Sequence, residues 1–169
     1  GTYLSNTKLL SEQGWNGLLI EGKEFPLTKQ HFVTKENILE ILESYNTPIE
    51  FDLLSIDIDG NDYWILHEIL TKHKPRVIVS EFNSEHPLEQ SKTIEYDPAF
   101  TFDNYTDYYG YTYGAGVKLA EKFGYTIIYQ QSNMNLFYLR NDLVSETPEF
   151  KKEVYRHWNG VSNKKWIEI

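Results

Sequence analysis

The chain has 169 residues, enough for one domain with a sizeable core, and 40% of them are hydrophobic and 24% charged, as is ordinary for globular proteins. A net charge of −9, with lysines scattered or in pairs, excludes the basic footprint that a nucleic-acid-binding protein needs. The absence of cysteine excludes disulfides, cysteine zinc sites and a thiol nucleophile.

The sequence shows no targeting or membrane-spanning segment. Its first residues lack a basic region followed by an apolar run, and its longest apolar runs are too short to span a bilayer. A chain without cysteine also fits a reducing compartment. We therefore expect a cytoplasmic protein that contacts neither membrane nor nucleic acid.

The first fifty residues predict two helices and two short strands. Residues 5–7 (Ser-Asn-Thr) are typical of a helix N-cap, and Gly14 suits the position just after the helix. Residues 17–22 are apolar up to Glu21 and Gly22, which predicts a short buried strand. We then expect a loop over 23–30, a brief strand over 31–33, and a helix over 38–45 that Thr34 caps and Pro48 closes.

The remaining sequence continues the alternation of strands and helices. Residues 51–57 give the strongest strand prediction, because a continuous apolar run is typical of a strand buried on both faces of a parallel sheet. Residues 84–113 lack a periodic pattern and predict a long loop that contains a cluster of tyrosines. The other expected elements are a helix over 61–71, a strand over 76–81, a helix over 117–123, an antiparallel hairpin of strands 125–129 and 134–139, and a helix around 150–158.

This order of elements predicts an α/β fold with a mostly parallel, Rossmann-like sheet, helices on both faces and a terminal antiparallel hairpin. Three of the predicted strands end in an acid, at Glu21, Asp57 and Glu81. Ligands bind at the carboxyl ends of the strands in open α/β sheets. The three acids are therefore predicted to lie at the edge of the sheet where such folds bind their ligands.

Several segments, taken in order, resemble class I S-adenosylmethionine-dependent methyltransferases, and most closely their FkbM-like group. The segments are 14–22 (GWNGLLIEG), 51–64 (FDLLSIDIDGNDYW), 75–83 (PRVIVSEFN), 96–98 (YDP), 113–115 (YGA), 124–125 (GY) and 135–140 (NLFYLR). The resemblance covers residues 1–140, which we expect to form the methyltransferase-like domain, with 141–169 as a helical tail. Such enzymes begin with a strand and a glycine-rich loop, whereas residues 1–7 resemble only the end of that loop, so we expect a chain shortened at its N-terminus.

The resemblance implies an enzyme that uses S-adenosylmethionine to methylate a hydroxyl group of a small molecule or saccharide. It implies that Glu21 accepts hydrogen bonds from the cofactor ribose. The full expected cofactor set is Ser5, Asn6, Thr7, Glu21, Gly22 and Asp57. The expected catalytic residues, which would face the acceptor, are Asp57, Asp59, Glu81 and Asn83.

The acidic segment 57–62 (DIDGND) contains more candidate functional side chains than any other segment. The sequence alone does not decide among several roles for them. Its carboxylates could attract the sulfonium cation, act as a general base or bind a divalent metal through Asp57 and Asp59. Asn61 or Asp62 could instead cap the next helix. An Asp-x-Asp metal site would suit a glycosyl- or nucleotidyltransferase, and a non-catalytic α/β binding module is a further alternative. The tyrosine cluster could be a substrate lid or a packed hydrophobic cluster.

Overall fold

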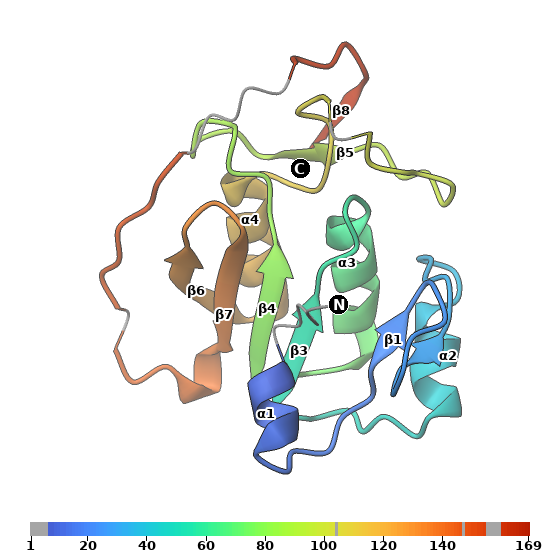
Figure 1. Ribbon diagram of the computed structural model, residues 1–169. Helices are drawn as coiled ribbons and strands as arrows, with labels where there is room; N and C mark the ends of the chain where they lie inside the picture. The colour runs from blue at the N-terminus through green and yellow to red at the C-terminus, as the bar shows by residue number, and fades with distance from the viewer. Residues whose placement is uncertain (1–6, 104, 147, 155–159) are drawn as a thin grey trace. The chain divides into compact units, whose positions relative to one another are not determined.

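The computed structural model describes residues 7–103, 105–146, 148–154 and 160–169. The chain divides into two compact units, residues 1–47 and 48–169. Figure 1 shows the elements of both units, which are described separately below. Among the described residues, no helix is both long enough and apolar enough to span a membrane.

The first unit contains two short helices and a pair of parallel strands. The helix α1 (Lys8–Glu12) follows Thr7, and Gly14 adopts a positive φ of 87° after its end, as predicted. The strand β1 (Ile20–Glu21) pairs in parallel with β2 (Lys29–Gln30), and α2 (Ile38–Ser44) follows. The prediction of a strand over 31–33 is wrong by two residues, because backbone hydrogen bonds from Lys29 to Leu19 and from His31 to Glu21 fix the earlier pairing.

The second unit is built on a four-stranded sheet with the order β3-β4-β7-β6. Its strands are β3 (Leu53–Ile56), β4 (Val77–Glu81), β6 (Tyr125–Gln131) and β7 (Asn135–Arg140). The strands β3 and β4 are parallel, while β7 is antiparallel to both β4 and β6. The structure thus confirms a mixed α/β domain that includes the predicted hairpin.

Two helices of 11 residues each, α3 (Asp62–Lys72) and α4 (Tyr113–Phe123), lie on the same face of this sheet (Figure 1). They contact each other directly, since Lys122 Nζ lies 2.8 Å from His67 Nε2 and the rings of His67 and Phe123 pack edge to face. Both crossovers advance in the same direction across the sheet, so right-handed connections place both helices on one side. The sequence predicted helices on both faces, whereas in this unit the described helices cover only one.

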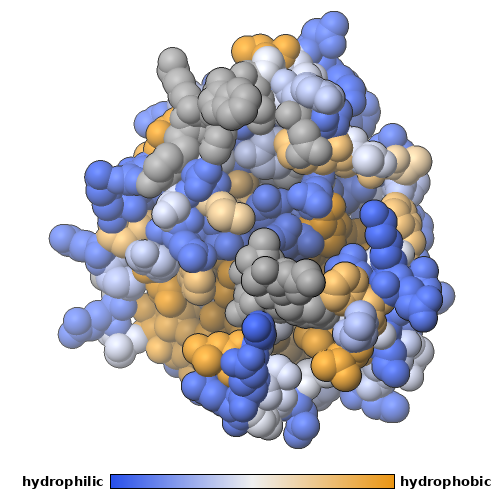
Figure 2. All heavy atoms as spheres, viewed as in Figure 1, coloured by the Kyte–Doolittle hydropathy of each residue, from blue (hydrophilic) through white to orange (hydrophobic). Residues whose placement is uncertain are grey.

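The two faces of the sheet differ in burial. The cross-strand row Ile78–Tyr138–Ile127 is buried beneath the helices. The opposite face carries the half-buried side chains of Val77 and Leu139, which are also paired across the strands. Figure 2 shows apolar side chains gathered on this second face, over β7 and β4.

The helix α4 begins at Tyr113, four residues earlier than the sequence predicts. Glycine has a low helix propensity, and the first turn of α4 contains Gly114 and Gly116. The sequence therefore did not predict that this turn is helical. Both glycines are used for close packing: a Cβ on Gly114 would lie 2.4 Å from Gln90 O, and one on Gly116 would lie 2.7 Å from the Tyr138 hydroxyl. The helix ends at Gly124, as predicted, with a left-handed φ of 79°.

The segment expected to be a long loop contains the strand β5 (Lys92–Ile94), which pairs antiparallel with β8 (Trp166–Glu168) near the C-terminus. The tail also contains a short 3-10 helix, η1 (Asn141–Leu143). A helix was expected around 150–158, but residues 150–154 form none, and 155–158 lie outside the described residues. The backbone N–H and C=O of Glu153 bond instead to the side chain of Gln130, at 3.1 and 2.7 Å.

Candidate functional site

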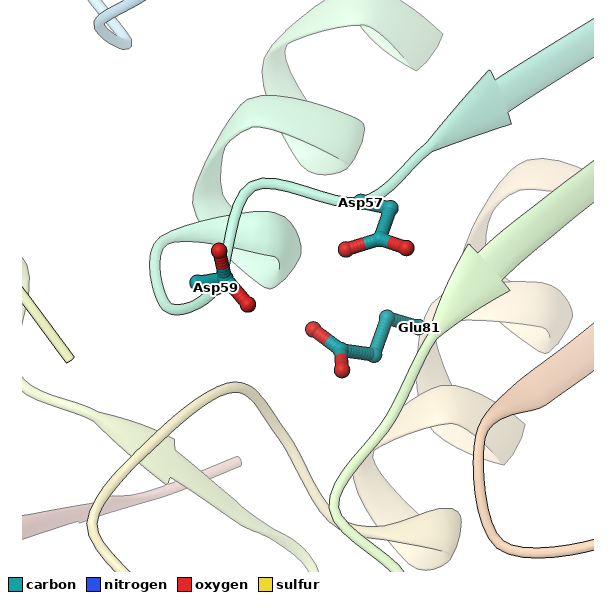
Figure 3. Close-up of side chains that lie close together, drawn as sticks. All are labelled: Asp57, Asp59 and Glu81. Atoms are coloured by element: carbon teal, nitrogen blue, oxygen red, sulfur yellow. The ribbon is translucent and has the colours of Figure 1, made fainter. Parts of the chain in front are cut away.

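Three carboxylates come together at one edge of the four-stranded sheet. Asp57 directly follows β3, Asp59 lies in the turn beyond it, and Glu81 is the last residue of β4. Because β3 and β4 are parallel neighbours, with Ile56 paired to Ser80, their carboxyl ends bring these side chains to one place. One carboxylate oxygen from each of the three residues lies within 4.8 Å of those from the other two. Figure 3 shows the three carboxyl groups of this carboxylate cluster converging from the two strand ends.

A fourth carboxylate builds the turn that carries Asp59. Asp62, the first residue of α3, is fully buried, and its two oxygens accept hydrogen bonds from the N–H groups of Ile58 and Gly60, each at 2.9 Å. Between them, Asp59 adopts a left-handed φ of 56°, which aspartate tolerates better than most residues. The side chain of Asp62 therefore holds the backbone conformation that presents Asp59 to the cluster.

The outer side of this turn packs against the chain that follows β5. A Cβ on Gly60 would lie 2.3 Å from the ring of Phe100, so a larger residue at this position would have to displace that ring. Asn61 donates a hydrogen bond from Nδ2 to Asp97 O at 2.8 Å, and Gly110 N–H donates to Gly60 O at 3.1 Å. The turn is thus held from inside by Asp62 and from outside by this packing.

Burial and mutual repulsion raise the pKa values of the clustered carboxyl groups. Burial, together with repulsion from Asp62, Asp57 and Asp59, raises the pKa of Glu81 to about 9. Burial raises the pKa of Asp62 to about 7, although its two backbone hydrogen bonds oppose that rise. Partial burial and repulsion from Asp59 raise the pKa of Asp57. Without a cation, Glu81 is therefore protonated at neutral pH.

The carboxylate cluster can hold a divalent cation. All three side chains offer hard oxygen ligands, which suit Mg²⁺ or Mn²⁺, and they come from two adjacent strand ends. The Oε2 atom of Glu81 is buried and has no hydrogen-bond partner among the described residues, so it is available to a ligand. A bound cation would also offset the repulsion that raises the pKa of Glu81.

The structure gives Asn83 a different role from the predicted one. Asn83 is fully buried, and its Nδ2 donates to the carbonyls of Asp107 and Tyr109 at 2.8 and 3.0 Å, while its Oδ1 accepts from Glu85 N–H at 3.0 Å. Both polar ends of the amide are used to brace the backbone, and none is left to face an acceptor. We therefore remove Asn83 from the candidate catalytic residues.

The other residues expected to bind the cofactor lie in the first unit. Glu21 and Gly22 are exposed at the end of β1, where Glu21 Oε1 accepts a hydrogen bond from Gly22 N–H at 3.0 Å. Thr7 occupies the N-cap of α1 without a side-chain cap hydrogen bond, and Ser5 and Asn6 lie outside the described residues. The cofactor contacts of these five residues remain predictions.

The tyrosine cluster is mostly interior. Tyr108, Tyr109, Tyr111 and Tyr113 are buried, whereas Tyr105 is 80% exposed. Burial of four of the five rings favours the packed hydrophobic cluster over a lid, because a lid must move away from the chain beneath it.

Two residues that shape the site were not assigned this role from the sequence. Asp62 was expected at most to cap α3, but it bonds backward to the turn. The sequence did contain a signal for this role, because Asp62 lies only four residues after Ile58 and two after Gly60, whose N–H groups it binds. Phe100 gave no signal, because its contact with Gly60 joins segments forty residues apart.

No protein-family model, curated protein or solved structure matches the chain.

Replacing Asp62 with asparagine should destabilise the protein. The amide can accept only one of the two backbone hydrogen bonds and turns an N–H group toward the other donor. We expect Asp62→Asn to lower the free energy of unfolding by about 1–3 kcal/mol in urea denaturation. The matched control is Asp52→Asn, which breaks only the exposed 3.2 Å ion pair with Arg76 and should cost less than about 1 kcal/mol. Equal losses in the two variants would contradict the role given to Asp62.

The raised pKa of Glu81 should make the free energy of unfolding depend on pH. A carboxyl group whose pKa rises from 4.5 to about 9 on folding stabilises the protein most below the lower value and loses that contribution as the pH rises. In the presence of a chelator, the free energy of unfolding should therefore fall between about pH 5 and pH 9. Glu81→Gln should flatten this fall, whereas Glu121→Gln, at an exposed position on α4, should leave it unchanged. A wild-type profile no steeper than that of Glu81→Gln would contradict the assignment.

Proposed function

We propose that the protein is a cytoplasmic S-adenosylmethionine-dependent methyltransferase that methylates a hydroxyl group of a small molecule or saccharide. The observation that carries the proposal is the carboxylate cluster of Asp57, Asp59 and Glu81 at the ends of the adjacent parallel strands β3 and β4. It lies where open α/β sheets bind their ligands. It also provides the bases that removal of a hydroxyl proton requires.

The strand order supports the Rossmann-like class of fold within this proposal. In the order β3-β4-β7-β6, only β7 runs opposite to the other strands, so three strands share one direction and the terminal hairpin adds the reversed one. A mostly parallel sheet with such a hairpin is what the resemblance implies. The helix α3 lies between β3 and β4 in the chain, and α4 lies between β4 and β6, as we expect of the crossover helices of such a sheet.

The negative charge of the cluster suits the proposed cofactor. S-adenosylmethionine carries its transferable methyl group on a sulfonium cation, which an acidic site attracts. Asp57 and Asp59 are exposed and offer this charge at the sheet edge. The resemblance assigns the ribose hydroxyls to Glu21, with Gly22, Thr7, Ser5 and Asn6 nearby in sequence.

The residues of the carboxylate cluster have different roles in the methylation of the acceptor hydroxyl. The hydroxyl oxygen forms a bond to the methyl carbon, the bond between that carbon and sulfur breaks, and the thioether leaves without charge. The hydroxyl proton passes to Asp57 or Asp59. Glu81, which is protonated at neutral pH because burial raises its pKa to about 9, donates a hydrogen bond and positions the acceptor. When a divalent cation is bound, it supplies Lewis acidity toward the acceptor oxygen.

A metal-dependent glycosyl- or nucleotidyltransferase is the second candidate. The specific observation that favours it is the set of three carboxylates with metal-ligand spacing, two of which form the Asp-x-Asp pair Asp57 and Asp59. In that enzyme the cation would hold the phosphates of a nucleotide donor. The two candidates therefore differ in the cofactor that the same cluster serves.

Calorimetric titration of S-adenosylhomocysteine into the protein tests the proposal. We expect a dissociation constant in the micromolar range, and a loss of about tenfold or more in Glu21→Ala and in Asp57→Asn, because each removes a charged partner of the cofactor. The control is Glu24→Ala, which removes an exposed acid close to Glu21 in sequence and should bind as the wild type does.

No binding of S-adenosylhomocysteine by the wild type would overturn the proposal. Binding of a sugar nucleotide that depends on Mn²⁺ and is lost in Asp59→Asn would then establish the second candidate.

A further inference from the structure

A groove of about 480 Å³ lies in the second unit, between the chain that follows β5 and the chain that precedes β8. Its walls include three aromatic rings, two acids and two lysines: Tyr96, Phe100, Tyr108, Glu95, Asp97, Lys164 and Lys165. These side chains come from segments about sixty residues apart in the sequence. The groove therefore depends on how the tail docks.

The tail is held firmly along this groove. The Tyr108 hydroxyl donates a hydrogen bond to Lys165 O at 2.6 Å and accepts one from Glu95 N–H at 3.0 Å. Asp107 Oδ1 accepts a hydrogen bond from Ser162 N–H at 2.7 Å. Together with the pairing of β5 and β8, these bonds fix the backbone on both sides of Lys164.

One wall of the groove is the same chain that packs on the turn of the carboxylate cluster. Phe100 lines the groove and covers Gly60, and Asp97 lines the groove while its carbonyl accepts a hydrogen bond from Asn61. Gly60 and Asn61 directly follow Asp59. Phe100 therefore contacts both the groove and the turn that presents Asp59.

The two lysines of the groove differ in their pairing. Lys165 Nζ lies 3.3 Å from a carboxylate oxygen of Glu95, so its charge is already balanced. Lys164 Nζ lies 5.2 and 5.7 Å from the ring centroids of Tyr108 and Phe100. Its charge adds to the backbone hydrogen bonds that lower the pKa of Asp103, although no carboxylate of the described residues lies within 4.0 Å of it. Lys164 thus offers a cation beside an apolar wall in a chain of net charge −9.

We propose that this groove binds the methyl acceptor and that the acceptor is a small ring-bearing anion. Its anionic group contacts Lys164 and its ring packs against Phe100 and Tyr108, which directs a hydroxyl group toward the carboxylate cluster. The inference deepens the proposed function and rests on it for the role of acceptor. Lys164 acts as the residue that selects for charge and has no part in the proton transfer.

The test is an NMR titration of the full chain with 4-hydroxybenzoate, in the absence of cofactor. We expect saturable shifts of the backbone amides of Tyr96, Phe100, Tyr108 and Lys164. The neutral analogue 4-hydroxybenzyl alcohol should bind about tenfold more weakly, as should 4-hydroxybenzoate to Lys164→Ala, because both lose a charge-assisted contact. Lys165→Ala is the matched control and should change the affinity by less than about twofold, since Glu95 already balances that lysine.

No saturable binding of 4-hydroxybenzoate, or equal affinity in the wild type and Lys164→Ala, would overturn the inference. Titration of S-adenosylhomocysteine into the same variant separates this failure from failure of the proposed function. Unchanged binding of S-adenosylhomocysteine by Lys164→Ala is expected. If the groove binds 4-hydroxybenzoate while the wild type binds no S-adenosylhomocysteine, the role of acceptor is overturned.

Discussion

The parallel pairing of β3 with β4 is the constraint on which the rest of the site depends. Because the two strands run side by side in the same direction, the residues that follow them must share one edge of the sheet. This edge receives Asp57 and Asp59 from one strand and Glu81 from the other, closer together than their charges favour. Burial, together with this crowding, raises the pKa values of Asp57 and Glu81. Binding of a cation or a proton would reduce the repulsion among these carboxylates.

The surrounding structure holds this crowded arrangement from two sides. The buried carboxylate of Asp62 organises the turn from within, and Phe100 closes over Gly60 from outside. The same outer segment forms the groove with the tail, whose lysines supply positive charge to an otherwise acidic chain. The carboxylate cluster and the groove are therefore joined through one stretch of backbone, because Phe100 and Asp97 line the groove and also contact the turn at Gly60 and Asn61.

Local pattern in the sequence was enough to predict the four strands of the larger sheet and the acids at the ends of β3 and β4. The apolar runs before Asp57 and Glu81 predict two buried parallel strands, and parallel strands bring their carboxyl ends together. What could not be predicted depends on contacts between distant segments. The pairing of β5 with β8, the contact of Phe100 with Gly60, and the burial of Asn83 beneath the loop each arise only when the chain is folded. Asn83 shows the limit most clearly, since its position after a strand suggested a catalytic role and its hydrogen bonds give it a structural one.

The most direct test of the account is whether the cluster behaves as one electrostatic unit. Carbon-13 NMR can follow the side-chain carboxyl group of Glu81 through a pH titration of the metal-free protein. The account predicts a midpoint near the value of about 9 that burial and repulsion give this group, and a lower midpoint in the double variant Asp57→Asn, Asp59→Asn, in which burial and repulsion from Asp62 remain. A midpoint near the ordinary glutamate value of 4.5, unchanged in the double variant, would contradict the convergence of the three carboxylates.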